Sequence, residues 1–156
     1  MPAQDTGRTE RVIEAGKVKK QVDITLQFLG EVEMGINKSL ERLREIERES
    51  LKNGDLELYR WAGYVRSYMR DVSKLMEDIE VALRSEKINV SEVVQKFFEI
   101  KEIDRKIKMT REEHPKEYKE VWEDITSTLE TASSIWSGIL WDLIKEERQK
   151  ETRPDS

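Results

Sequence analysis

The feature that most constrains the fold is a series of apolar residues between positions 56 and 85, spaced alternately by four and three. The series consists of Leu58, Ala62, Val65, Met69, Val72, Met76, Ile79 and Leu83. Residues with this spacing lie along one stripe of an α-helix. Trp61, Tyr68 and Leu75 widen the stripe into a broader band. The segment therefore predicts a long amphipathic helix that packs one side against a core.

The same period recurs through most of the chain. It is found over residues 9–52, in a third segment that starts near position 90, and over residues 116–147. Only three prolines and seven glycines interrupt 156 residues, so the elements are expected to be long. Four amphipathic helices with short links predict an all-α fold, an antiparallel up-down bundle of four long helices.

Short polar signals mark the expected helix ends. Asn53-Gly54-Asp55 predicts the end of the first helix, with Gly54 following its last turn and Asp55 capping the N-terminus of the next helix. Asn89 or Ser91 is expected to cap the third helix, and His114-Pro115 to end it. We expect one domain over residues 9–147, between disordered tails at 1–8 and 148–156.

The first segment is too long for the bundle. As one helix, residues 9–52 would span roughly 66 Å, whereas the second and fourth segments reach only about 45–50 Å. Two arrangements would resolve the mismatch. The helix breaks or bends near Gly30–Gly35, which we favour, or its N-terminal half projects and is covered by a partner such as a second copy.

Composition narrows the function classes. The net charge of −5 and pI of about 5.2 argue against binding that depends on neutralising nucleic-acid phosphates. The absence of cysteine excludes disulfides, thiolate metal sites and cysteine nucleophiles. Surplus Glu, Lys and Arg is typical of thermophile proteins. No signal-peptide pattern and no run of 18 apolar residues is found, so we expect a soluble cytoplasmic protein without a membrane role.

The fourth segment has two unusual faces. Residues 125–141 contain a single charge, Glu130. One side carries the apolar stripe of Ile125, Leu129, Ala132, Trp136 and Ile139. The opposite side carries Ser127, Thr131, Ser134, Gly138 and Trp141, where a surface helix normally shows Glu and Lys. A helix that avoids charge all round is usually buried all round.

Two interpretations of this face stay open. In the first, the N-terminal half of the first segment covers it, with Gly30 and Gly35 allowing a close approach. In the second, Trp141, Gly138, Ser134 and Thr131 form a homodimer or partner interface, because an aromatic anchor ringed by small polar residues resembles a binding hot spot.

No residue pattern indicates catalysis, a cofactor or a metal. His114 is the only histidine, and a solvated position at a helix end is its expected role. The acidic pairs Glu112-Glu113 and Glu146-Glu147 point to different sides of a helix and make weak metal sites. Phosphate-binding loops and nucleophile elbows are absent from the sequence. We therefore expect a protein that is not an enzyme.

One basic cluster supports a second hypothesis. It contains Arg105, Lys106, Lys108 and Arg111. Such runs usually form solvated faces with ion pairs four residues apart, here Glu102 with Lys106 and Asp104 with Lys108. Contact with nucleic acid through this cluster is the alternative function. Trp61, Tyr64 and Tyr68 share one stripe and indicate core or interface rather than a base-stacking platform.

Three segments resemble the YaaR-like family of small bacterial helical proteins of unknown function. They are Trp61-Ala-Gly-Tyr-Val65-Arg-Ser-Tyr68-Met69-Arg70-Asp, Ile100-Lys-Glu-Ile-Asp104-Arg-Lys-Ile107 and Trp136-Ser-Gly138-Ile-Leu-Trp-Asp-Leu-Ile144. The resemblance covers roughly residues 40–145, and Ser137 departs from the glutamine of that family. It implies an all-helical fold and assigns no activity. Together these observations predict a non-enzymatic helical bundle that acts through protein–protein contacts and self-associates.

Overall fold

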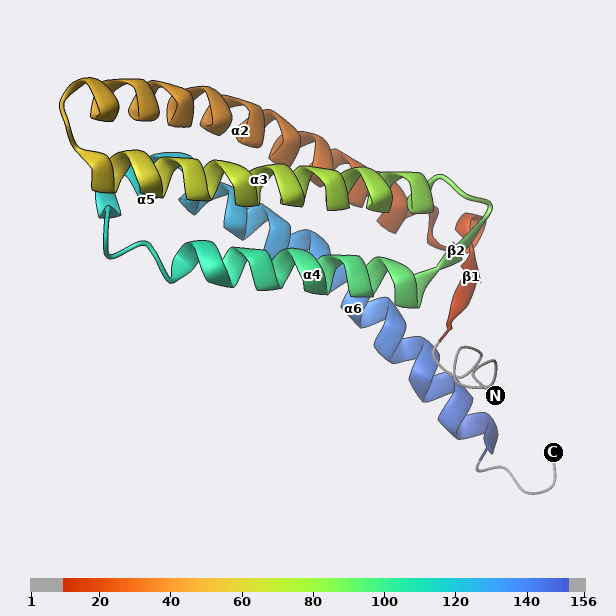
Figure 1. Cartoon of the computed structure of the whole chain (residues 1–156). Coiled ribbons are helices and arrows are strands. Elements are labelled where there is room, and N and C mark those ends of the chain that lie inside the picture. The colour runs from red at the N-terminus through yellow and green to blue at the C-terminus, as the bar shows by residue number, and fades with distance from the viewer. Residues whose placement is uncertain (1–9, 152–156) are drawn as a thin grey trace, which may run out of the picture.

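The computed structural model describes residues 10–151, most of which are helical (Figure 1). Four long helices dominate, and a short helix, a 3-10 turn and two short strands join them. The elements in chain order are β1 (Val12–Glu14), η1 (Ala15–Val18), α2 (Lys19–Lys52), α3 (Leu56–Leu83), β2 (Lys87–Asn89), α4 (Val90–Lys108), α5 (Pro115–Val121) and α6 (Glu123–Glu151).

The long helices form a ring in which each contacts two neighbours. α2 packs against α3, α3 against α4, α4 against α6, and α6 against α2. Successive helices run in opposite directions, as the ribbon shows (Figure 1). The predicted antiparallel up-down bundle is therefore confirmed. Within the described residues, no helix is long and apolar enough to cross a membrane.

The predicted apolar stripes form the core. Of the eight residues in the α3 series, seven are buried and Leu58 is partly buried. The largest buried side chains include Trp122, Trp136 and Phe97. Because each helix contributes one such stripe, the four stripes meet along the axis of the ring and exclude water from it.

The predicted helix ends are confirmed at residues 53–55 and at Asn89, whereas the expected end of the third helix at His114-Pro115 is wrong, since α4 stops at Lys108. Gly54 adopts a φ of 74° after α2, a left-handed conformation that favours glycine. The Asp55 side chain accepts a hydrogen bond from the backbone N–H of Leu58, 3.2 Å away. Asn89 caps α4 through the N–H of Glu92, at 3.0 Å. Pro115 opens α5, as its fixed φ favours.

The expected break near Gly30–Gly35 is wrong, because α2 is helical without interruption from Lys19 to Lys52. The first segment is shorter than predicted as a helix because its N-terminal residues 12–18 form β1 and η1 instead. β1 pairs antiparallel with β2, and Ile13 lies opposite the fully buried Ile88. Glycine inside a helix costs only about 0.5–1 kcal/mol, which packing readily offsets.

The fourth segment is two helices, not the single one predicted. α5 ends at Val121, and α6 starts at Glu123. The Ser39 hydroxyl of α2 donates a hydrogen bond of 2.7 Å to the Val121 carbonyl. α6 then continues to Glu151, beyond the expected end at 147, so the start of the predicted C-terminal tail is helical. The predicted tail at 1–8 lies outside the described residues.

The third helix also ends earlier than expected. α4 stops at Lys108, and turns carry the chain to His114 before α5. These turns let α5 lie against α2 while α6 crosses between α2 and α4. The arrangement leaves one long side of α6 facing outward.

Candidate functional site

The inner side of α6 is anchored to α2 by a buried hydrogen-bond chain. The Trp136 indole N–H donates to the Thr25 hydroxyl at 2.7 Å, and that hydroxyl donates to the Gln21 carbonyl at the same distance. Neither the Trp136 nor the Thr25 side chain reaches solvent. Trp136 is thereby held in the core, as its place in the apolar stripe predicts, and α6 cannot rotate about its axis without breaking this contact.

A second anchor joins α6 to α4 through the buried carboxylate of Asp104. This carboxylate accepts hydrogen bonds from the Trp122 indole at 2.6 Å and from the Thr126 hydroxyl at 2.7 Å. Lys108 forms an ion pair with it at 3.1 Å and reaches Glu130 at 3.2 Å. Burial alone would lower the pKa of Lys108, but the hydrogen bonds to both acids outweigh it and raise this pKa. Since Asp104 is fully paired, its role is to position α6 rather than to bind a ligand.

The outer face of α6, which we define as Ser127, Thr131, Ser134, Gly138 and Trp141, is exposed along its whole length. Trp141 leaves 52% of its surface in solvent. A side chain placed on Gly138 would meet nothing within 4 Å. The interpretation in which the first segment covers this face is therefore wrong. The close approach of α2 is made by Gly35 alone, against Ile125 on the inner side of α6.

Two hydroxyls of the outer face, those of Thr131 and Ser134, donate hydrogen bonds within the helix itself. Thr131 donates to the Ser127 carbonyl at 3.1 Å, and Ser134 donates to the Glu130 carbonyl at 2.9 Å. Their donors are therefore already used when a partner approaches, and little polar hydration must be replaced. The face combines small side chains, two hydroxyls bonded within the helix and one large exposed indole.

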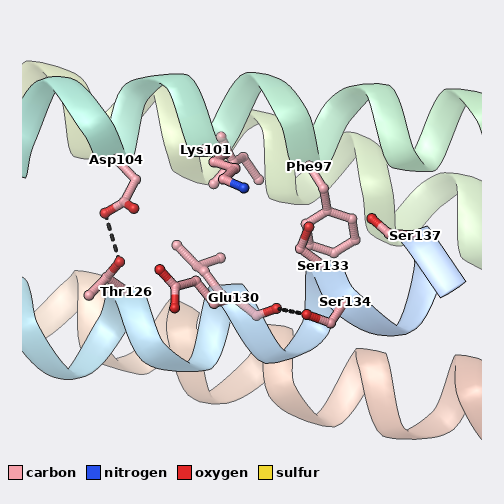
Figure 2. A pocket seen from close by; sticks show the side chains of 10 residues that line it. Phe97, Lys101, Asp104, Thr126, Glu130, Ser133, Ser134 and Ser137 are labelled. Atoms are coloured by element: carbon pink, nitrogen blue, oxygen red, sulfur yellow. Dashed lines mark hydrogen bonds between the residues drawn. The ribbon is translucent and has the colours of Figure 1, made fainter.

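A groove of about 410 Å³ runs beside the outer face, between α4 and α6. Phe97, Ile100 and Leu129 supply its apolar lining, and Ser133, Ser134 and Ser137 supply small side chains along α6. Figure 2 shows Lys101 and Asp104 approaching it from α4, opposite Glu130. Sequence reasoning missed this groove, because its two walls belong to helices whose neighbourhood depends on the ring order of the bundle.

The four residues of the basic cluster do not form one bare cationic surface. Lys108 is held between two acids, and Arg105 pairs with Glu102 at 2.7 Å. Lys106 lies 5.7 Å from the centre of the Tyr68 ring. The expected pair of Asp104 with Lys108 is confirmed, whereas Glu102 uses Arg105 rather than Lys106. Acids within this cluster weaken its attraction for phosphate, and nucleic-acid contact stays a prediction.

His114 is half-buried against the Trp61 ring, with ring centres 5.5 Å apart, rather than solvated. The expected aromatic stripe is divided: Trp61 is buried, while Tyr64 is exposed. In the described part of the chain, no group of three or more His, Cys, Asp or Glu residues is placed to hold a metal ion. The outer face of α6 and the neighbouring groove are therefore the candidate site.

The chain matches no protein-family model, no curated protein and no solved structure at a significant level. The resemblance to the YaaR-like family thus stays a prediction from the sequence. The function has to be argued from the surface itself.

Proposed function

We propose that this protein is a non-catalytic helical bundle that works through protein–protein contacts, and that it self-associates through the outer face of α6. One observation carries the proposal: over the 15 residues from Ser127 to Trp141, the exposed side of α6 carries a single charge, Glu130 at its margin, which is paired with Lys108, in a chain that is 39% charged. Exposed surfaces of such proteins are normally laced with Glu and Lys. Sustained avoidance of charge on one exposed face indicates that the face is covered in the working state.

The composition of the face suits a contact surface. An exposed tryptophan supplies a large apolar area at little conformational cost, and such residues carry a disproportionate share of binding energy. The small residues Thr131, Ser134 and Gly138 next to it let another helix come close. Charged residues, which would have to be desolvated on contact, are kept to the margins.

The experiment is to measure solution mass for the wild type and for Trp141→Glu over a range of concentrations. We expect the wild type to associate and the variant to be monomeric, because the glutamate would bury a charge within the contact. Val81→Glu is the matched control, since Val81 is 71% exposed on α3, away from the outer face of α6. A wild type that is monomeric throughout, with Trp141→Glu equally stable, would remove the proposal.

A further inference from the structure

We infer that the outer face of α6 pairs with the same face of a second copy in antiparallel orientation, and that Trp141 of each chain enters the α4–α6 groove of the other. This inference rests on the proposed function and specifies the geometry of that association. It is argued from three properties of α6: the angular position of Trp141, the side on which the groove lies, and the charges at the two helix ends.

Trp141 and the groove lie on the same side of the outer face. At about 100° per residue, Trp141 is displaced roughly 40° from the midline of this face. The groove residues Glu130, Ser133 and Ser137 are displaced by roughly 60–120° in the same sense, toward α4. The indole does not enter the groove of its own chain, because it remains half in solvent.

Two-fold symmetry decides which pairing brings the indole to a groove. When two identical helices pack antiparallel, the two-fold axis is perpendicular to both helices and to the line that joins them. Rotation about this axis leaves the α4 sides of the two chains on the same side of the pair, so a side chain displaced toward its own α4 is also displaced toward α4 of the partner. The partner subunit's Trp141 then approaches the groove. When the helices pack parallel, the axis runs along them and the displacement is reversed, so that each indole would point away from the groove. Only the antiparallel pair brings the Trp141 indole of one chain to the α4–α6 groove of the other.

The register follows from placing the indole over the groove. If Trp141 of one chain lies opposite Glu130 of the other, the midpoint of the pair falls at about Ile135 and Trp136. Ser134 and Gly138 then flank the axis, where their small size lets the helix backbones approach closely. The same register brings Glu123 opposite Arg148.

Charge complementarity supports the same orientation. On the outer side of α6, the first turn carries the acids Glu123 and Asp124, and the last turns carry Lys145 and Arg148, while Glu146, Glu147 and Glu151 project from other sides of the helix. All these residues are exposed. On this side, antiparallel pairing sets Glu123 and Asp124 of one helix against Lys145 and Arg148 of the other, whereas parallel pairing would set like charges together. The ends thus favour the orientation that the groove requires.

Cysteine cross-linking tests the orientation, and the chain contains no cysteine of its own. In the antiparallel pair, two copies of Ser134→Cys lie within about 5 Å of each other along the helix axis, whereas two copies of Ser127→Cys lie about 25 Å apart. A short bismaleimide should therefore join Ser134→Cys to itself and not Ser127→Cys. It should also join Ser127→Cys to Lys145→Cys in a mixture. Self-linking of Ser127→Cys would show parallel pairing and overturn the inference.

Filling the groove tests whether the Trp141 indole of one chain binds in the groove of the other. Ser133→Phe places an aromatic ring in the groove, and we expect it to raise the dissociation constant by at least about tenfold, as loss of a hot-spot contact does. Trp141→Ala removes the indole and leaves the groove intact. A mixture of the two variants should associate more tightly than either alone, because one chain supplies the indole and the other the open groove. Ser67→Phe, on an exposed position of α3, is the matched control.

The outcomes separate this inference from the proposed function. If Trp141→Glu is monomeric but Ser133→Phe associates normally, self-association through the outer face is supported, and the binding of Trp141 in the groove of the partner is wrong. A monomeric wild type removes both. If Ser133→Phe loses its fold, judged by circular dichroism, the cross-linking pattern still decides the orientation in chains whose groove is unchanged.

Discussion

Two buried polar side chains, Thr25 and Asp104, determine how α6 is turned. Thr25 accepts a hydrogen bond from the indole N–H of Trp136 in α6, and Asp104 accepts one from the indole N–H of Trp122, which directly precedes α6. A buried N–H without an acceptor is costly, so these contacts select the rotation in which both indoles point inward. That rotation in turn points Trp141 outward.

The contact between Thr25 and Trp136 gives the first prediction. Thr25→Val keeps the shape of the side chain but removes the acceptor, leaving the buried indole N–H unpaired. We expect a loss of about 1–3 kcal/mol in the free energy of unfolding, measured in urea. In a Trp136→Phe background the same change should cost less, because phenylalanine has no N–H. Thr128→Val, whose hydroxyl reaches only its own helix backbone, is the control; equal losses at both positions would contradict the assignment.

Lys108 and Tyr118 give a prediction about alkaline pH. Hydrogen bonds to Asp104 and Glu130 outweigh burial and raise the pKa of Lys108 above its ordinary 10.5, while burial raises the pKa of Tyr118 above 10.0. A raised pKa in the fold means that the folded chain holds these protons more tightly than the unfolded chain. Their contribution is therefore fully present below pH 10 and is lost as the pH rises through the folded values.

We expect the urea midpoint to fall as the pH rises above 10. The double variant Lys108→Met with Tyr118→Phe should show a shallower fall over the same range, since neither replacement titrates. An unchanged slope in the double variant would show that other groups control the alkaline transition.

At the scale of the elements, local signals and tertiary contacts act on different parts of a helix. Gly54 and Asp55 end one helix and begin the next through their own backbone and side-chain geometry, without help from distant residues. The break at Trp122 has no such signal. It depends on Ser39 of α2, whose hydroxyl donates a hydrogen bond to the Val121 carbonyl. It also depends on Asp104 of α4, whose carboxylate accepts one from the Trp122 indole.

The glycines of α2 give a prediction at this scale. Gly30 is helical, and an added methyl group would meet nothing within 4 Å. Gly30→Ala should therefore stabilise the protein by about 0.5–1 kcal/mol, because alanine loses less backbone entropy on folding. At Gly35 the added carbon would lie 3.1 Å from Ile125, so the gain there should be smaller or reversed. Thermal unfolding of both variants checks the order, and an equal gain at the two positions would contradict the packing of α2 on α6.

At the scale of the whole molecule, Trp141 is a built-in reporter of association. It is 52% exposed, whereas Trp61, Trp122 and Trp136 are buried. Acrylamide should therefore quench mainly Trp141 in dilute protein, and the quenched fraction should fall as the concentration rises and the outer face is covered. Trp141→Phe should abolish the accessible component at every concentration. Quenching that does not depend on concentration would argue against self-association through this face.

The bundle could be predicted from the sequence because its causes are periodic. Seven residues of the α3 series lie in the core where the spacing places them, and the same holds for Trp136 in α6. The strand β1 could not be predicted in this way. Three residues carry too little pattern, and their pairing partner, β2, lies more than 70 positions away.

The candidate site likewise has one part that the sequence determines and another that depends on tertiary contacts. The sequence by itself determined that α6 has an uncharged face containing Trp141 and Gly138, because side-chain order on a helix follows from its period. Only the tertiary structure decided that this face is uncovered and that a groove with α4 lies beside it. Both depend on which helices are neighbours in the ring and on how the buried partners of Trp122 and Trp136 turn α6. Those partners, Asp104 and Thr25, are 18 and 111 residues away in the chain.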